Sequence, residues 1–305
     1  MDDFKRMAVF AAVVQHGSMT AAAKVLGISP SAISQHIRQL EREGGVTLLH
    51  RSTRQIALTD AGQRFYLQCA HMTAAADRAR AELAAAQQDP SGELRLSAPV
   101  GFARHAAPAL GAWLARFPQL SLRLLLDDAP IDLIQARVDL ALRYGHQADS
   151  SWVARKLAHT PFWLCAAPQW LQAHGGLPLH PVQLPTTHWL GLSRHDQAHL
   201  HLQWQHQTTG EHFAQQVQPN AWCNHLGAVQ QLCQAGLGLA ILSPIDIAGE
   251  IARGELVRLL PGWDMGRLDI WAVTPQRDTQ PAKVRQAIEE LQAYFAMLEG
   301  AQREV

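Results

Sequence analysis

The sequence predicts an α+β protein with several domains: short helices and a hairpin, then one long helix, then an α/β region. Its 305 residues are enough for about two domains of roughly 100–200 residues each. Residues 4–88 show mainly helical periodicity, interrupted by glycines and by one alternating stretch. From residue 93 onward, strand and helix patterns alternate, which is typical of an α/β fold with mainly parallel strands.

Composition and charge exclude several classes of protein. The chain is 48% hydrophobic and has 26 basic and 26 acidic residues, so it can bury ordinary cores but is not uniformly basic. We see no signal peptide and no run of apolar residues long enough to span a membrane. The cysteines Cys69, Cys165, Cys223 and Cys233 form no C-x-x-C motif. A reduced, cytoplasmic protein is expected, and a redox role for Cys223 stays open as an alternative.

The first helix is expected near residues 4–15. One face of it carries Phe4, Met7, Ala8, Ala11 and Val14. Helical spacing of apolar residues predicts that this face packs against a core.

Two further helices surround a tight turn. An alanine-rich helix near 19–26 begins after Ser18, a plausible N-cap, and ends at Gly27, which suits a left-handed conformation. Ser29 then caps a third helix, and Pro30 occupies its first position, where a missing N–H costs little. The spacing of Ile33, Ile37 and Leu40 turns them inward. On the opposite face lie Ser31, Gln35, Arg38 and Arg42, with Ser34 beside them.

Such a polar helix face can enter the major groove of DNA, where base edges offer donors and acceptors. A solvated face in an ordinary helical bundle would show the same spacing. Val46–Thr59 alternates apolar and polar residues around a basic turn, which predicts a hairpin with Arg51 and Arg54 near its tip. Residues 1–66 carry eight basic and five acidic side chains, a net charge of +3, which favours the DNA interpretation.

A long helix is expected from Thr59, its cap, to about Gln88. Its apolar seam steps by four and three residues through Phe65, Cys69, Met72, Ala76, Ala79, Leu83 and Ala86. This heptad pattern predicts a dimerisation helix, and packing on its own domain is the alternative. A dimer would present two reading helices to two half-sites.

Asp89, Pro90 and Gly92 break the long helix and mark a hinge. The strands expected after it are "ELRLSAP", "LSLRLLLDD", "DLALRYG", "FWLCAAP", "HWLGLS", "LGLAILSP" and "LDIWAVTP". Helices are expected near 104–117 and, as a short one, at "IDLIQARV" (131–138). In such folds ligands bind where strands end and helices begin.

Other motifs are weak. His195, His199, His201 and His206 include a His-x-His that could ligate zinc or copper, but the alternation of Leu200, Leu202 and Trp204 also fits a half-buried hairpin. "GLGLAI" leads into a strand, so it is not a dinucleotide fingerprint. We predict no metal, no cofactor and no catalytic constellation. An enzyme or plain solute-binding protein, with an N-terminal interaction module, is the competing hypothesis.

The N-terminal motifs together resemble the winged helix-turn-helix of LysR-type transcriptional regulators. The resemblance covers residues 1–66 through "FAAVVQHGSMTAAAKVLGISPSAISQHIRQLE" and "LLHRSTRQIALTDAG". It implies phosphate contacts from Ser18, Thr20 and Lys24, and wing contacts from Arg51 and Arg54. It implies base or backbone contacts from Pro30, Ser31, Ala32, Ser34, Gln35 and Arg38. Gly44-Gly45 departs from the family, which usually has leucine before the glycine that closes this helix.

More weakly, the resemblance extends over the remaining chain. It implies a DNA-binding domain at 1–58, a linker helix at 59–89 and an effector domain at 93–305. The homodimer expected through the linker helix is expected to pair further into a homotetramer, with the dimer as the alternative. That domain would resemble a periplasmic solute-binding protein, with subdomain I at about 93–161 and 267–305 and subdomain II at about 162–266. "DLALRYG" is similar to a subgroup that includes glycine-cleavage activators.

The implied partners are double-stranded DNA and a small-molecule effector held between the subdomains. The implied cleft residues combine apolar and hydrogen-bonding groups with one cation, which could pair with a carboxylate. They are Pro99, Val100, Gly101, Arg143, Tyr144, Leu192, Ser193, Asn224, His225 and Ser243.

Overall fold

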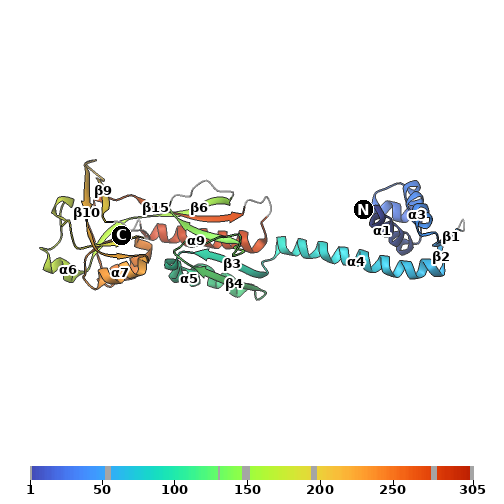
Figure 1. Cartoon of the computed structure of the whole chain (residues 1–305), viewed down its shortest axis with the longest axis horizontal. Coiled ribbons are helices and arrows are strands. Elements are labelled where there is room, and N and C mark those ends of the chain that lie inside the picture. Colours follow the sequence, from blue (N-terminus) through green and yellow to red (C-terminus); the bar gives the residue numbers. More distant parts are fainter. Residues whose placement is uncertain are drawn as a thin grey trace. The chain divides into compact units, whose positions relative to one another are not determined.

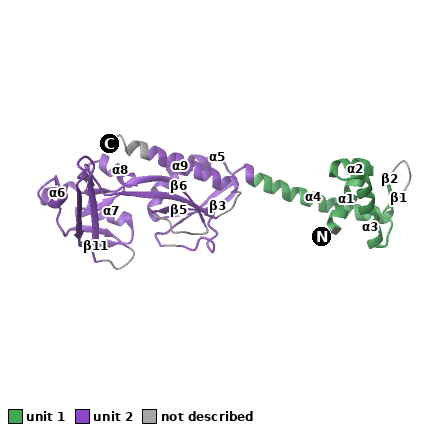
Figure 2. Ribbon diagram, turned by 90° about the horizontal axis from the view of Figure 1, so that it is seen from above, with its two compact units in different colours: residues 1–86 green, residues 87–305 purple. Residues whose placement is uncertain are grey.

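A computed structural model describes most of the chain. The described residues are 2–51, 56–129, 131–145, 152–193, 198–275 and 280–302. The chain divides into two compact units, residues 1–86 and residues 87–305 (Figure 2). None of the helices among the described residues is long and apolar enough to cross a membrane.

Unit 1 consists of helices and one small hairpin (Figure 1). Its elements are α1 (Asp2–His16), α2 (Met19–Leu26), α3 (Pro30–Gly44), β1 (Leu49–Arg51), β2 (Ile56–Leu58) and most of α4 (Asp60–Gln88). β1 and β2 pair in antiparallel register, with Leu49 opposite Leu58, so the hairpin expected from the alternating stretch is present.

The expected face of α1 is confirmed in part, because Ala11 is buried and Met7, Ala8 and Val14 are half-buried. Val9, Phe10 and Val13 are buried, whereas Phe4 is 66% exposed. The helix is covered from two sides, since α2 and α3 pack on it and the Phe65 ring of α4 lies 5.5 Å from the Phe10 ring. Because α1 is packed from two sides, a wider arc of it is buried than a single apolar stripe predicts. Phe4 lies in the first turn of α1, which is exposed.

The end of α3 is well anchored despite its two glycines. Gly44 is still helical, and Gly45 has φ of 64° and donates its N–H to the Glu41 carbonyl. The Glu41 side chain in turn accepts from the backbone N–H groups of Leu48 and Leu49, at 2.8 and 3.2 Å. The carboxylate therefore fixes the start of the hairpin to the last turn of α3.

Unit 2 has two five-stranded sheets. The first lobe is built on the sheet β4-β3-β5-β15-β6. Its elements are β3 (Gly92–Ala98), η1 (Val100–Phe102), α5 (Ala103–Arg116), β4 (Leu120–Leu126), β5 (Leu140–Tyr144), β6 (Trp152–Pro161), β15 (Arg267–Pro275) and α9 (Ala282–Gln302).

The second lobe is built on the sheet β11-β8-β12-β7-β13 and a small sheet β10-β9-β14. Its strands are β7 (Trp163–Ala166), β8 (Trp189–Leu192), β9 (Leu200–His206), β10 (His212–Val217), β11 (Pro219–Cys223), β12 (Leu239–Leu242), β13 (Val257–Leu259) and β14 (Trp263–Asp264). Its helices are α6 (Pro168–Ala173), η2 (Pro181–Gln183), α7 (Leu226–Gln234) and α8 (Pro244–Ala252).

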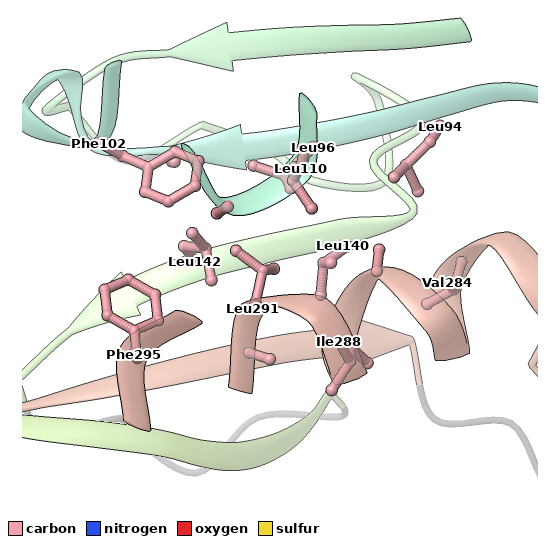
Figure 3. Close-up of a cluster of buried hydrophobic side chains, with 14 of the residues drawn as sticks. Leu94, Leu96, Phe102, Leu110, Leu140, Leu142, Val284, Ile288, Leu291 and Phe295 are labelled. Carbon is pink, nitrogen blue, oxygen red and sulfur yellow. The ribbon is translucent and has the colours of Figure 1, made fainter. Parts of the chain in front are cut away.

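The first lobe has one large apolar core. Side chains of α9, among them Ile288 and Leu291, meet Leu140 and Leu142 of β5 in the cluster that Figure 3 shows. Ala141 faces the other side of the sheet, in a second cluster. β5 is thus buried on both faces, as its continuous apolar run predicts.

Two expectations about unit 2 are wrong. Residues 131–138 form turns instead of a short helix, and Arg137 adopts φ of 53°, which a helix cannot include. The sheets are also evenly mixed rather than mainly parallel. β15 runs antiparallel to β5 and β6, and β7 runs antiparallel to β12 and β13, because these strands enter their sheets from the other lobe.

The chain crosses between the lobes twice. β6 ends at Pro161 and β7 begins at Trp163, while the return crossing runs from Asp264 to Arg267. The Phe162 N–H donates to the Gly266 carbonyl at 3.0 Å, so the two crossing segments are paired. The two lobes are thus joined by two adjacent segments, each lobe has its own core, and a cleft lies between them.

Candidate functional site

The outer face of α3 is the first candidate site. Ile33 and Ile37 are almost fully buried, at 0% and 1% exposed, and they fix which side of the helix faces outward. Ser31, Gln35, Arg38 and Arg42 are exposed on the other side. The Ser29 hydroxyl accepts from the Ala32 N–H at 3.1 Å, so the helix start is capped, as predicted.

The other residues predicted to contact DNA surround this face. Pro30 is exposed at the start of α3, and Ala32 and Ser34 are half-buried. On α2, Thr20 and Lys24 are exposed, while the Ser18 hydroxyl accepts from the Ala21 N–H at 3.0 Å and caps the helix. Arg51 is the last residue of β1; its side chain, and Arg54 entirely, lie outside the described residues.

The second candidate site is a cavity of about 350 Å³ between the lobes of unit 2. It brings together seven of the ten residues predicted from the sequence: Pro99, Gly101, Arg143, Tyr144, Leu192, Asn224 and Ser243. They lie at or just after the ends of β3, β5, β8, β11 and β12. The family resemblance implied these residues, and their positions agree with the rule that ligands bind beyond strand ends, although the sheets are mixed.

The sequence reasoning missed the other half of the lining. These residues are Asp127, Asp128, Ala129, Phe162, Leu226, Ile241, Asp246 and Leu268. Asp127 and Asp128 follow the end of β4, so the strand-end rule could have found them. Phe162 and Leu268 lie at the two segments where the chain crosses between the lobes. These segments reach the cavity only because the two lobes pack against each other.

Three predicted cleft residues do not line this cavity. Val100 and His225 line a neighbouring cavity of about 420 Å³, together with Arg104. Gly101, Leu226 and Asp246 line both cavities and so form the wall between them. Ser193 is in the lining of neither cavity, and its N–H donates to the Cys223 carbonyl at 2.9 Å.

A polar network under the cavity joins the two lobes. Nε2 of His105, on α5, lies 3.1 Å from an Asp246 carboxylate oxygen on α8. Nδ1 of the same ring lies 2.8 Å from the Tyr294 hydroxyl on α9. Arg104 donates to the Asp246 carbonyl and, at 3.1 Å, to the Gln230 side chain. Neither Arg104 nor His105 was predicted, because their partners are distant in sequence.

Tyr144 supplies a hydroxyl to the cavity. Burial raises its pKa, and the nearby Asp246 and Asp128 carboxylates raise it further. A raised pKa keeps the phenol protonated, so Tyr144 can donate a hydrogen bond to a ligand.

Three of the four cysteines are buried, and Cys223 is half-buried. Burial raises the pKa of Cys69 to about 11, and burial raises that of Cys165 and Cys233 as well, so these thiols stay protonated. In the part of the chain that is described, no three His, Cys, Asp or Glu side chains are grouped to hold a metal. His206 packs against Trp263, and His195 lies outside the described residues.

A capped polar helix face in one unit and a two-lobed ligand cavity in the other define a ligand-responsive DNA-binding regulator. Two family descriptions match the chain: "Bacterial regulatory helix-turn-helix protein, lysR family" over residues 4–63 and "LysR substrate binding domain" over residues 87–296. The chain belongs to the LysR family of transcriptional regulators.

Similar proteins are named as regulators. The chain is 36% identical to the regulator PtxR of Pseudomonas aeruginosa over 289 residues, covering 94% of this chain and 91% of that protein. It is also 36% identical to the regulator DmlR of Escherichia coli, covering 94% and 93%. These names count against the competing hypothesis of an enzyme. The resemblance of "DLALRYG" to glycine-cleavage activators stays a prediction.

Solved structures share the fold. The full-length virulence activator AphB of Vibrio cholerae is 28% identical, with a TM-score of 0.68 over 95% of this chain and 99% of that chain. CrgA, a LysR-type regulator of Neisseria meningitidis, is 27% identical, with a TM-score of 0.53 over 96% of each chain. The protein is therefore a DNA-binding transcriptional regulator with an effector-binding domain, and it is not an enzyme.

Proposed function

We propose that the chain acts as a cytoplasmic homo-oligomer that reads DNA with α3 and senses an effector in the cavity between the lobes. DNA binding would belong to residues 1–58, pairing to the helix at 59–89, and sensing to 93–305, with subdomains at 93–161 plus 267–305 and at 162–266. The observation that carries the proposal is the face of α3, which is polar and exposed while its other side is anchored in the core.

Base reading would depend on the middle of α3. Gln35 is exposed there, and its amide can pair with adenine edges in the major groove. Arg38 lies three residues further on the same face and can reach a guanine edge or the backbone. Ser31, Ala32 and Ser34 would sit close to the bases, with Pro30, Ser18, Thr20 and Lys24 near phosphates and Arg51 and Arg54 in the wing.

Gln35→Ala is expected to reduce discrimination between operator variants, costing about 1–3 kcal/mol at the base pair it contacts. Gel shifts on the chain's own upstream DNA and on single-base variants would measure this. Lys24→Ala is the matched control, because loss of a phosphate contact should weaken all sequences alike and reduce the salt slope by about one. If Gln35→Ala leaves the ranking of the variants unchanged, the assigned role is wrong.

Effector binding would use the cavity between the lobes. Its lining combines apolar side chains with Arg143, Tyr144, Asn224 and Ser243, a mixture typical of small-molecule sites. The network through His105 and Asp246 joins the lobes directly beneath it. A ligand that contacts both lobes would favour one arrangement of them, and segment 89–92 would transmit the change to the DNA-binding region.

Gly101→Trp is expected to fill the cavity and abolish any effect of effector on DNA binding. Gly101 lies in η1, lines both cavities, and has no heavy atom within 4 Å of the position a Cβ would take. The variant should therefore fold. Without effector, the variant should bind upstream DNA with an affinity within about threefold of the parent's, because Gly101 lies outside the DNA-binding region. A threefold change in affinity corresponds to less than about 1 kcal/mol of binding free energy. A Gly101→Trp protein that still responds to effector would contradict the proposed site.

Pairing would use the exposed part of α4. Phe65 and Cys69, the first two seam residues, pack into the core of their own unit. Ala76, Ala79, Leu83 and Ala86 continue the seam and are exposed. The apolar seam of α4 thus continues beyond the part of the helix that packs in unit 1. An exposed apolar seam on a long helix supports a homodimer formed by two such helices. Pairing of dimers into a tetramer is proposed only from the family resemblance.

A further inference from the structure

The charged side chains of the cavity between the lobes are unbalanced. Among its described lining residues, Asp127, Asp128 and Asp246 carry carboxylates, and Arg143 alone carries a positive charge. The surrounding wall is largely apolar, with Phe162 and Ile241 on it. Three carboxylates against one guanidinium give the lining a net negative charge, so a ligand that brings positive charge is favoured over one that brings only negative charge.

Asp246 is the carboxylate best placed to meet such a ligand. It lies in the first turn of α8, its side chain is 13% exposed, and it belongs to the wall shared by both cavities. One carboxylate oxygen contacts His105, and the other has no partner among the described residues. One acceptor is therefore fixed in place, and one remains for a ligand.

The buried His105 ring holds this carboxylate without needing a positive charge of its own. With the proton on Nε2, the ring donates to Asp246 and its Nδ1 accepts from the Tyr294 hydroxyl. Both contacts are satisfied by neutral imidazole, which is 3% exposed. The ring then orients the Asp246 carboxylate through its Nε2.

Hydrogen-bond donors complete the site. No described residue accepts from the Tyr144 hydroxyl, and the Asn224 side chain is exposed. These groups and Arg143 can bind acceptor oxygens on the same ligand. The lining thus fits an amphipathic molecule that has an amine, an acceptor such as a carboxylate, and an apolar part.

We propose that the effector carries a protonated amine, that Asp246 binds the ammonium group, and that His105 is the residue that positions Asp246. The inference rests on the proposed function of this cavity. It commits to amines, such as amino acids, rather than to plain or hydroxylated acids.

Matched compounds test the class of ligand by thermal unfolding of the full-length protein. One series is leucine, leucic acid, isocaproic acid and isoamylamine; the other is phenylalanine, phenyllactic acid, phenylpropionic acid and phenethylamine. A ligand at roughly ten times its Kd should raise the Tm by about 3 °C. We expect the shift from the amine-bearing members of at least one series. If the acids without an amine raise the Tm as much, or if no compound raises it, the amine class is overturned.

Variants on α8 and α5 test the residues. Asp246→Asn should remove the preference for amines, whereas Glu250→Gln, one turn along α8 and outside this cavity's lining, should keep it. His105→Gln retains a donor and should keep part of the preference, while His105→Phe should lose it. If Asp246→Asn keeps the preference, the assignment of Asp246 is overturned, provided that its thermal unfolding without ligand shows a folded effector domain.

Gly101→Trp distinguishes this failure from failure of the proposed function. If acids without an amine shift the Tm and Gly101→Trp removes that shift, the cavity remains the effector site and only the amine class falls. If the shifts persist in Gly101→Trp, the ligands bind elsewhere and the proposed site falls as well.

Discussion

Gly62→Ala is expected to destabilise unit 1 by about 3 kcal/mol or more and to abolish DNA binding. Gly62 is buried in the first turn of α4, and a Cβ there would lie 2.1 Å from the Leu48 carbonyl oxygen. That oxygen belongs to the backbone, so no side-chain rotation can relieve the clash. Helix and hairpin would have to separate, although Thr59 joins them by donating to the Thr47 carbonyl and accepting from the Gly62 N–H.

Urea unfolding followed by circular dichroism, together with gel shifts on upstream DNA, would measure the effect of Gly62→Ala. Gly44→Ala is the matched control, because nothing lies within 4 Å of a Cβ at Gly44 and the residue is helical. It should be neutral or stabilising by up to about 1 kcal/mol. If the Gly62→Ala protein has an unchanged free energy of unfolding and full DNA affinity, the close approach of α4 to the Leu48 carbonyl is not required for stability.

Leu83→Lys is expected to break the proposed dimer and to lower operator affinity by about a hundredfold or more. Leu83 is 71% exposed on α4, on the seam that continues beyond the core of unit 1. Two lysines facing each other across a helix pair would bury charge against charge. The second DNA-binding domain would then no longer be linked to the first, and its contribution to operator affinity would be lost.

Light scattering would give the oligomeric state of the Leu83→Lys protein, and gel shifts would give its affinity. Ala85→Lys is the matched control, since Ala85 is also exposed but lies two residues away, on the opposite side of the helix. It should remain a dimer with near-parental affinity. A dimeric Leu83→Lys protein would refute the seam as the pairing surface.

Local features of the fold were predictable because local interactions create them. The caps at Ser18, Ser29 and Thr59 and the left-handed glycine at Gly27 act within a few residues. The inward face of α3 follows from its spacing alone. By contrast, the burial of Val9, Phe10 and Val13 on α1 was not predicted, because α4 supplies a second packing partner that no short window of sequence contains.

Sequence patterns were sufficient for the order of the elements in unit 1, the polar face of α3 and several strand ends that border the cavity, because capping, periodicity and turn chemistry act over short distances. Tertiary structure alone decided the strand directions and the network under the cavity. His105 meets Asp246 and Tyr294 across 141 and 189 residues of chain. Such contacts form only once two lobes have packed, since nothing in the local sequence of either partner depends on the other.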